Sequence, residues 1–130
     1  MSKLKKVLVI DDDPSFITAM TPVLESRGYR VEAAYNKSEA TQKIERFRPD
    51  LIVLDIMMER LSDGFDLCRE LKRDPDLSEI PVLAVSAINK EVGMRFSPKT
   101  DGEYFQADDF MEKPVSPENL LERVEELLKA

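Results

Sequence analysis

The sequence predicts an α/β fold in which parallel strands alternate with covering helices. Five short apolar runs alternate along the chain with longer stretches of helical periodicity. Three of these runs are almost continuous branched aliphatic residues, which is typical of strands buried on both faces. The length of 130 residues suits one domain. We therefore expect five strand–helix units in a single domain over residues 1–130, with no effector domain after Ala130.

The five expected strands differ in pattern. The runs at 7–10, 51–54 and 82–85 are the aliphatic ones, whereas the run at 29–34 alternates and the run at 109–112 has the weakest apolar pattern.

The first helix is expected to begin at Pro14. Asp13 is a good N-cap, and proline is favoured at the first helical position. Pro22 is expected to free the Thr18 carbonyl and kink the helix, and Gly28 marks its end. Its core face is predicted to hold Phe16, Ile17, Met20, Val23 and Leu24.

The next two helices carry weaker boundary signals. Asn36 with Glu39 resembles a capping box, and Pro49 ends the second helix, whose inward face is predicted to hold Ala40, Ile44 and Phe47. The third helix is expected at 64–73, with Leu67, Cys68 and Leu71 toward the core.

The fourth connection is irregular, and the fifth is clear. Gly93, Pro98 and Gly102 interrupt the stretch at 88–108, so a short helix or a loop is expected over 92–104. The fifth helix begins after Ser116 with Pro117 at its first position. Its apolar face is predicted to hold Leu120, Leu121, Val124, Leu127 and Leu128.

Composition excludes several classes of function. The chain has no histidine and one cysteine, Cys68, which excludes internal disulfides, imidazole metal sites and histidine-based triads. The net charge of -7 argues against direct nucleic-acid binding. No apolar run reaches the ~20 residues of a membrane span, and residues 1–6 lack the apolar segment of a signal peptide. We therefore expect a cytoplasmic protein without membrane insertion.

Polar residues gather at the carboxyl ends of the expected strands. If the strand order is 2-1-3-4-5, the acids after the first and third strands converge in one pocket. Clustered carboxylates either take up protons or hold a cation, and oxygen ligands suit Mg²⁺. Each residue alone has an ordinary explanation as a cap, a loop hydroxyl or a surface charge, but the joint arrangement favours a site. The set is Asp11, Asp12, Asp55, Ser86 and Lys113, whereas the neighbouring Asp13 is expected to be only a helix cap.

Five motifs in order resemble the receiver domain of bacterial two-component response regulators, of the chemotaxis-regulator type. The resemblance covers essentially the whole chain and implies a flavodoxin-like, doubly wound sheet of order 2-1-3-4-5 and a role as a phosphoprotein in signalling. The motifs are Val7-Leu-Val-Ile-Asp-Asp-Asp-Pro14, Leu51-Ile-Val-Leu-Asp55-Ile-Met-Met58, Asp63-Gly64-Phe65, Val82-Leu-Ala-Val-Ser86-Ala87 and Phe110-Met-Glu-Lys-Pro114.

The resemblance assigns roles to individual residues. It implies that Asp55 takes a phosphoryl group from a histidine kinase or phosphotransfer partner. Mg²⁺ would be held by Asp12, Asp55 and the Met57 carbonyl, with Asp11 close by. Lys113 would pair with a phosphoryl oxygen, and the Lys113–Pro114 bond would be cis. Ser86 and Phe110 would form the switch that responds to phosphorylation.

Several positions depart from the family pattern. Glu59 stands where the family usually has proline, Gly64 lies further from Asp55 than usual, and Gln106 replaces a common glycine. The stretch from Ser86 to Lys113 is longer than usual in the family, so the resemblance implies no particular output partner.

Three other functions would require different residues from a phosphorylated receiver domain. A pseudo-receiver would use the same fold as an unphosphorylated scaffold, but it has no chemical need for the full set of site residues. An aspartyl phosphatase would need a second acid where Met57 stands, and a flavodoxin would need a phosphate-cradling loop where the first acids stand. The protein would not be an enzyme beyond its own phosphorylation and dephosphorylation. The resemblance implies that Met57 and Ile88 border the approach of water, so they are expected to obstruct it and make that dephosphorylation slow.

Overall fold

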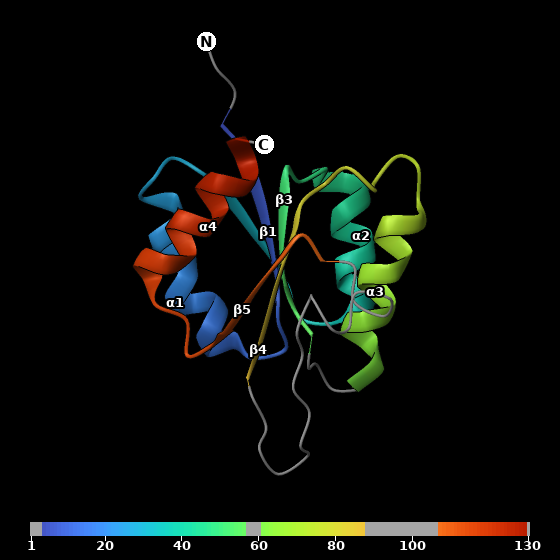
Figure 1. Ribbon diagram of the computed structural model, residues 1–130, viewed down its shortest axis with the longest axis horizontal. Coiled ribbons are helices and arrows are strands. Elements are labelled where there is room, and N and C mark those ends of the chain that lie inside the picture. The colour runs from blue at the N-terminus through green and yellow to red at the C-terminus, as the bar shows by residue number, and fades with distance from the viewer. Residues whose placement is uncertain (1–3, 57–60, 88–106, 130) are drawn as a thin grey trace.

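Five parallel strands form one sheet in the order β2-β1-β3-β4-β5 (Figure 1). The computed structural model describes residues 4–56, 61–87 and 107–129. The predicted order is confirmed, and every predicted strand is present to within two residues at either end. The strands are β1 (Lys6–Ile10), β2 (Arg30–Ala34), β3 (Leu51–Asp55), β4 (Val82–Ala87) and β5 (Asp109–Lys113).

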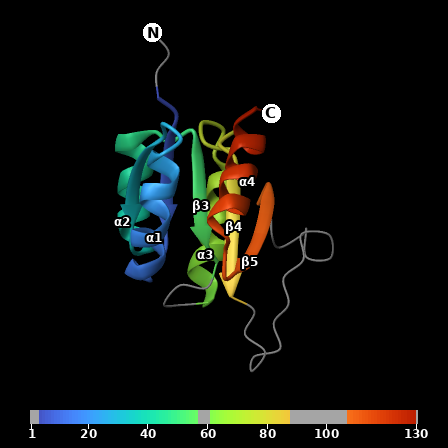
Figure 2. The same cartoon turned by 90° about the vertical axis from the view of Figure 1, so that its left-hand side faces the viewer.

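Two layers of helices cover the sheet. On one face, α1 (Pro14–Glu25) and α4 (Pro117–Lys129) pack against a core that includes Val9, Val53 and Val85. On the other face lie α2 (Lys37–Phe47) and α3 (Leu61–Arg73), as Figures 1 and 2 show. β1, β3 and β4 are therefore buried from both sides, which explains their continuous aliphatic sequences.

Helix α1 begins where the sequence predicts. The Asp13 carboxylate accepts a hydrogen bond from the Ser15 amide at 2.9 Å, and Pro14 is the first helical residue. The helix remains one element through Pro22 and ends at Glu25, and Gly28 follows with a φ of +85°. Of the predicted core face, Ile17, Met20 and Leu24 are buried, and Phe16 and Val23 are half-buried.

Helix α2 has the predicted cap with a small shift. The Glu39 amide donates to the Asn36 side chain at 2.8 Å, and the Glu39 carboxylate accepts from the Tyr35 amide at 2.8 Å. The reciprocal bond thus reaches one residue before the N-cap. The helix ends at Phe47, and its predicted inward residues are all buried.

Helix α3 begins at Leu61, so the predicted start at Gly64 is wrong. Gly64 lies inside the helix and does not mark its end. Glycine is required there because the backbone of Ile56 lies very close to it. A Cβ at Gly64 would lie 2.7 Å from the Ile56 carbonyl carbon and closer still to its oxygen. Leu67, Cys68 and Leu71 are buried, as predicted.

Helix α4 begins at Pro117 with Ser116 as its cap, and its apolar face is buried or half-buried as predicted. The irregular stretch expected at 92–104 lies outside the described residues. Within the described ranges, no helix is long and apolar enough to cross a membrane.

Candidate functional site

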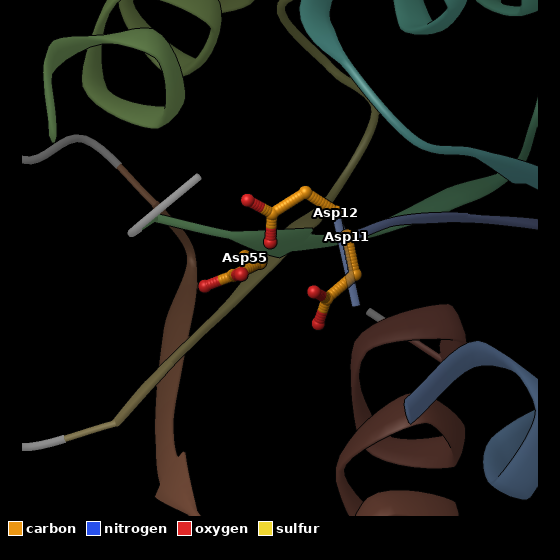
Figure 3. Close-up of side chains that lie close together, drawn as sticks. All are labelled: Asp11, Asp12 and Asp55. Carbon is orange, nitrogen blue, oxygen red and sulfur yellow. The ribbon is translucent and has the colours of Figure 1, made fainter. Parts of the chain in front are cut away.

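The carboxyl ends of four neighbouring strands place the predicted site residues at one edge of the sheet. Asp11 follows β1 directly, Asp55 ends β3, Ser86 lies in β4, and Lys113 ends β5. Because all strands are parallel, these ends meet at the same edge. Figure 3 shows the side chains of Asp11, Asp12 and Asp55 gathered there.

Three carboxylates form the centre of this site. One ligand oxygen from each of Asp11, Asp12 and Asp55 lies within 4.8 Å of the others. Asp11 is fully buried and Asp55 is 4% exposed, whereas Asp12 is more accessible. Burial of two like charges at this separation is unfavourable unless a positive charge offsets it.

Lys113 supplies part of that positive charge. Its ammonium donates to an Asp11 carboxylate oxygen at 2.8 Å and lies 3.8 Å from Asp55 Oδ2. Three carboxylates and one ammonium leave a formal charge of -2 (three negative charges against one positive). A group of hard oxygen ligands with this charge suits a divalent cation such as Mg²⁺.

Several hydrogen bonds fix Asp11 in place. Its amide donates to the Ala34 carbonyl at 3.0 Å, and its other carboxylate oxygen accepts from the Asp13 amide at 2.8 Å. Together with the bond from Lys113, these contacts use both carboxylate oxygens. Asp11 therefore anchors Lys113 beside Asp55.

Comparison with known proteins identifies the family. The family model of the response regulator receiver domain matches residues 7–125. The chain belongs to this family. It is 38% identical to the alkaline phosphatase synthesis transcriptional regulatory protein PhoP of Bacillus subtilis over 125 residues, 96% of this chain and 49% of that protein. It is 35% identical to the DNA-binding dual master transcriptional regulator RpaA of Synechocystis, over 97% of this chain and 50% of that protein.

Solved receiver domains share the fold. A putative response regulator from Chloroflexus aurantiacus superimposes with a TM-score of 0.85 at 30% identity, covering 98% of this chain and 100% of that one. The receiver domain of a histidine kinase from Syntrophus aciditrophicus gives 0.81 at 33% identity, covering 96% and 90%. The chain spans about half the length of the two curated relatives, and receiver domains are signalling modules of two-component systems.

The two predicted switch residues of this receiver domain lie near the site. Ser86 is buried in β4, opposite Glu112 of β5. Phe110 is half-buried in β5 and packs against the core on the α2 and α3 face. The Lys113–Pro114 bond is cis, as the resemblance implied. Met57 and Ile88 lie outside the described residues, and so do Glu59 and Gln106.

Two residues near the site were not assigned to it from the sequence. Phe16, predicted only as a core residue, places its ring 4.5 Å from the Lys113 ammonium. Gly64 packs against the backbone of Ile56, the residue after Asp55. The spacing of Gly64 from Asp55 was a usable signal, whereas nothing local in the sequence links Phe16 to Lys113.

Proposed function

We propose that Asp55 is the phosphoacceptor of this receiver domain and takes a phosphoryl group from a histidine kinase or a phosphotransfer protein. The observation that carries the proposal is the position of the buried Asp55 carboxylate. It shares a cluster with Asp11 and Asp12, and the Lys113 ammonium lies 3.8 Å away. Response regulators work with histidine kinases, and the absence of histidine from this chain fits a phosphohistidine on the partner.

The donor set fits Mg²⁺. Asp12 and Asp55 would be the carboxylate ligands, Asp11 would act close by, and the predicted Met57 carbonyl lies outside the described residues. A bound Mg²⁺ would neutralise charge on the phosphoryl oxygens and on the acids. Without that charge, the cluster would repel an incoming phosphoryl group.

The transfer needs little from the protein beyond position and charge. An Asp55 carboxylate oxygen attacks phosphorus, and the new O–P bond forms as the N–P bond of the donor breaks. The electron pair of that bond returns to the imidazole nitrogen, which is then protonated. Lys113, held by Asp11, neutralises charge on a phosphoryl oxygen.

We further propose that Ser86 and Phe110 transmit the phosphorylated state. Ser86 would donate a hydrogen bond to a phosphoryl oxygen, and Phe110 would turn into the space that Ser86 vacates. Ser86 lies in β4 and Phe110 lies in the neighbouring β5. The surface around β5 is therefore the proposed output surface. The output partner is a protein rather than nucleic acid, given the net charge of -7.

The proposal is tested with acetyl phosphate as donor and intact mass as readout. We expect one added phosphate in the presence of Mg²⁺, none after chelation, and none for Asp55→Asn. Asp13→Asn is the matched control, because it removes one charge from the same acidic stretch but can still cap α1. Normal labelling of Asp55→Asn would reject the phosphoacceptor. Absence of labelling in the parent protein would favour a scaffold without phosphorylation.

We also propose that the phosphorylated state is long-lived. Met57 and Ile88, at the positions that border the water approach in this family, cannot orient water by hydrogen bonding. The double variant Met57→Asn with Ile88→Glu is expected to speed loss of phosphate by about 10-fold. Decay no faster than that of the parent would place control of water elsewhere.

A single receiver domain over residues 1–130 and a cytoplasmic location also stay predictions.

A further inference from the structure

β2 is an edge strand of the sheet, and its outer side could pair with a further strand. β2 pairs with β1 alone, and within the described ranges no strand covers its other side. The Arg30 amide and the Ala34 carbonyl bond toward β1. Because backbone groups alternate along a strand, the amides and carbonyls of Val31 and Ala33 point to the open edge.

The backbone amides at the two ends of this open edge already have hydrogen-bond partners. The Tyr29 amide donates to the Leu24 carbonyl, and the Tyr35 amide donates to the Glu39 carboxylate. The open N–H donors are therefore confined to the short window of Val31 to Ala33. A window of this size suits an extended segment of a few residues.

A cavity flanks the window on each face of the sheet. Figure 2 shows α1 and α2 together at the side of the molecule opposite β5. The α2 side holds a cavity of about 570 Å³, and the α1 side holds one of about 360 Å³. Both cavities are lined by Glu32, Ala33 and Tyr35 of the edge itself. An added strand sends alternate side chains to opposite faces, so it would fill both cavities.

The cavity on the α2 side has four cations and two carboxylates, Glu32 and Glu39, in its lining. Lys43 in its wall pairs with Glu32 at 2.6 Å, and the Lys6 ammonium donates to the Phe47 carbonyl. Arg30 and Arg46 also line it, and neither has a carboxylate partner among the described residues. In a chain of net charge -7, this local excess of cations favours an acidic ligand.

The cavity on the α1 side is more apolar. Ile17, Pro22 and Val31 line it, together with two threonines. Pro22 has no N–H for the Thr18 carbonyl, so this wall also offers a backbone acceptor without its usual helical donor. Tyr35, 42% exposed, stands at the end of the window and borders both cavities.

We propose that the β2 edge is a docking site for an extended segment of a partner protein in which acidic and aliphatic residues alternate. The segment adds a strand beside Val31 and Ala33. Its acidic side chains enter the α2 cavity beside Arg30 and Arg46, and its aliphatic side chains enter the α1 cavity. A second copy of this chain fits less well, because its edge offers the same excess of cations and not the acidic side chains that Arg30 and Arg46 lack.

The probe is the blocked heptapeptide Glu-Val-Glu-Val-Glu-Val-Glu. Two control peptides have the same length: one replaces glutamate by lysine, and one groups the same residues as Glu-Glu-Glu-Val-Val-Val-Glu. We expect the alternating acidic peptide to shift the amide resonances of Val31 and Ala33, and both controls to bind at least about fivefold more weakly. Equal binding of a control peptide, or no shift at Val31 and Ala33, would overturn the proposal.

Two variants locate the binding on the protein. Ala33→Pro removes an outward N–H and is expected to abolish binding, while Arg46→Glu is expected to weaken it about fivefold or more. Arg73→Glu is the matched control for Arg46→Glu, because both residues are exposed cations in the last turn of a helix. If Ala33→Pro does not fold, the Arg46→Glu and Arg73→Glu pair decides alone, and equal affinity of these two variants rejects the site.

The remaining outcomes are also decisive. A concentration-dependent dimer of the protein alone that Arg46→Glu or Ala33→Pro dissolves would assign the edge to a second copy instead. Binding of free glutamate as tight as that of the peptide would reduce the site to a small-anion pocket. Both results overturn the proposal, and neither depends on whether Asp55 is phosphorylated.

Discussion

The two ends of the sheet differ in how their charged side chains are paired. At the amino end, the ammonium groups of Lys6 and Lys72 are matched by nearby acceptors. The Lys6 ammonium donates to the Phe47 carbonyl at 2.7 Å, and the Lys6 amide donates to Asp50 at 2.8 Å. Lys72 donates to the carbonyls of Ser78 and Ile80 and to Asp108, whose carboxylate also accepts from the Val82 amide.

At the carboxyl end, negative charge is concentrated. Asp11, Asp12 and Asp55 gather around the ammonium of Lys113, and the sum is -2. We infer that the contacts of Lys6 and Lys72 stabilise the fold, whereas repulsion among the three carboxylates opposes folding and favours a cation. Substitutions at the two ends should therefore change the free energy of unfolding with opposite signs.

The largest expected effect is at the amino end. Lys72→Met keeps most of the aliphatic stem but removes the donor for two carbonyls and one carboxylate. Since Lys72 is only 12% exposed, water replaces these bonds poorly, and we expect a loss of about 2 kcal/mol in the free energy of unfolding. Urea titration of the parent and the variant measures this loss, with the same dependence of the free energy of unfolding on urea concentration used for both.

Lys37→Met is the control for Lys72→Met. Lys37 pairs with Glu70 at 3.1 Å, but the Glu70 side chain is 61% exposed, so the pair contributes little. A loss for Lys37→Met as large as that for Lys72→Met would show that the amino end is not specially stabilised.

The opposite sign is expected for Asp12→Asn. This change lowers the repulsion within the acid cluster and should raise the free energy of unfolding by about 1 kcal/mol in chelator at low salt. Added Mg²⁺ should stabilise the parent but have much less effect on the variant, because a ligand that binds only the folded state stabilises it. Asp13→Asn, one residue along and exposed, should show no such gain. Destabilisation by Asp12→Asn in chelator would refute the view that this end carries unfavourable charge.

The sequence predicts the carboxyl end better than the amino end. Parallel topology brings the ends of β1, β3 and β5 to one edge, so the residues that follow each aliphatic run identify the acids and Lys113 without any knowledge of packing. The bonds of Lys72 depend on the path of the chain between α3 and β4, where no periodic pattern exists. A lysine near the end of a helix is usually a solvated charge, and sequence alone does not distinguish the two situations.

Glycine shows a second limit of the sequence. The sequence predicts that α3 begins at about Gly64, but the helix begins three residues earlier at Leu61. The contact of Gly64 with Ile56 is tertiary, and so are the cavities beside β2, which exist only once α1 and α2 are packed on opposite faces of the sheet.

The smallest expected effect compares cation–π contacts at the two ends. At the carboxyl end the Lys113 ammonium lies 4.5 Å from the Phe16 ring, and at the amino end the Lys6 ammonium lies 5.5 Å from the Phe47 ring. Lys6 is already bonded to the Phe47 carbonyl, whereas the ring of Phe16 borders an ammonium shared between Asp11 and Asp55. The attraction falls with distance, so Phe16 should matter more to Lys113 than Phe47 does to Lys6.

Double-mutant cycles with Phe→Leu and Lys→Met at each pair measure this difference, because a cycle removes the cost of the lost packing. We expect a coupling of about 0.5 kcal/mol between Phe16 and Lys113 and less between Phe47 and Lys6. Phe16→Tyr, which keeps a ring, should retain the coupling that Phe16→Leu loses. If Phe16 positions Lys113 for phosphoryl transfer, Phe16→Leu should also slow labelling of Asp55 by acetyl phosphate by about twofold, in line with the same energy. Equal couplings at the two ends would mean that the ring of Phe16 fills space and does not orient the lysine.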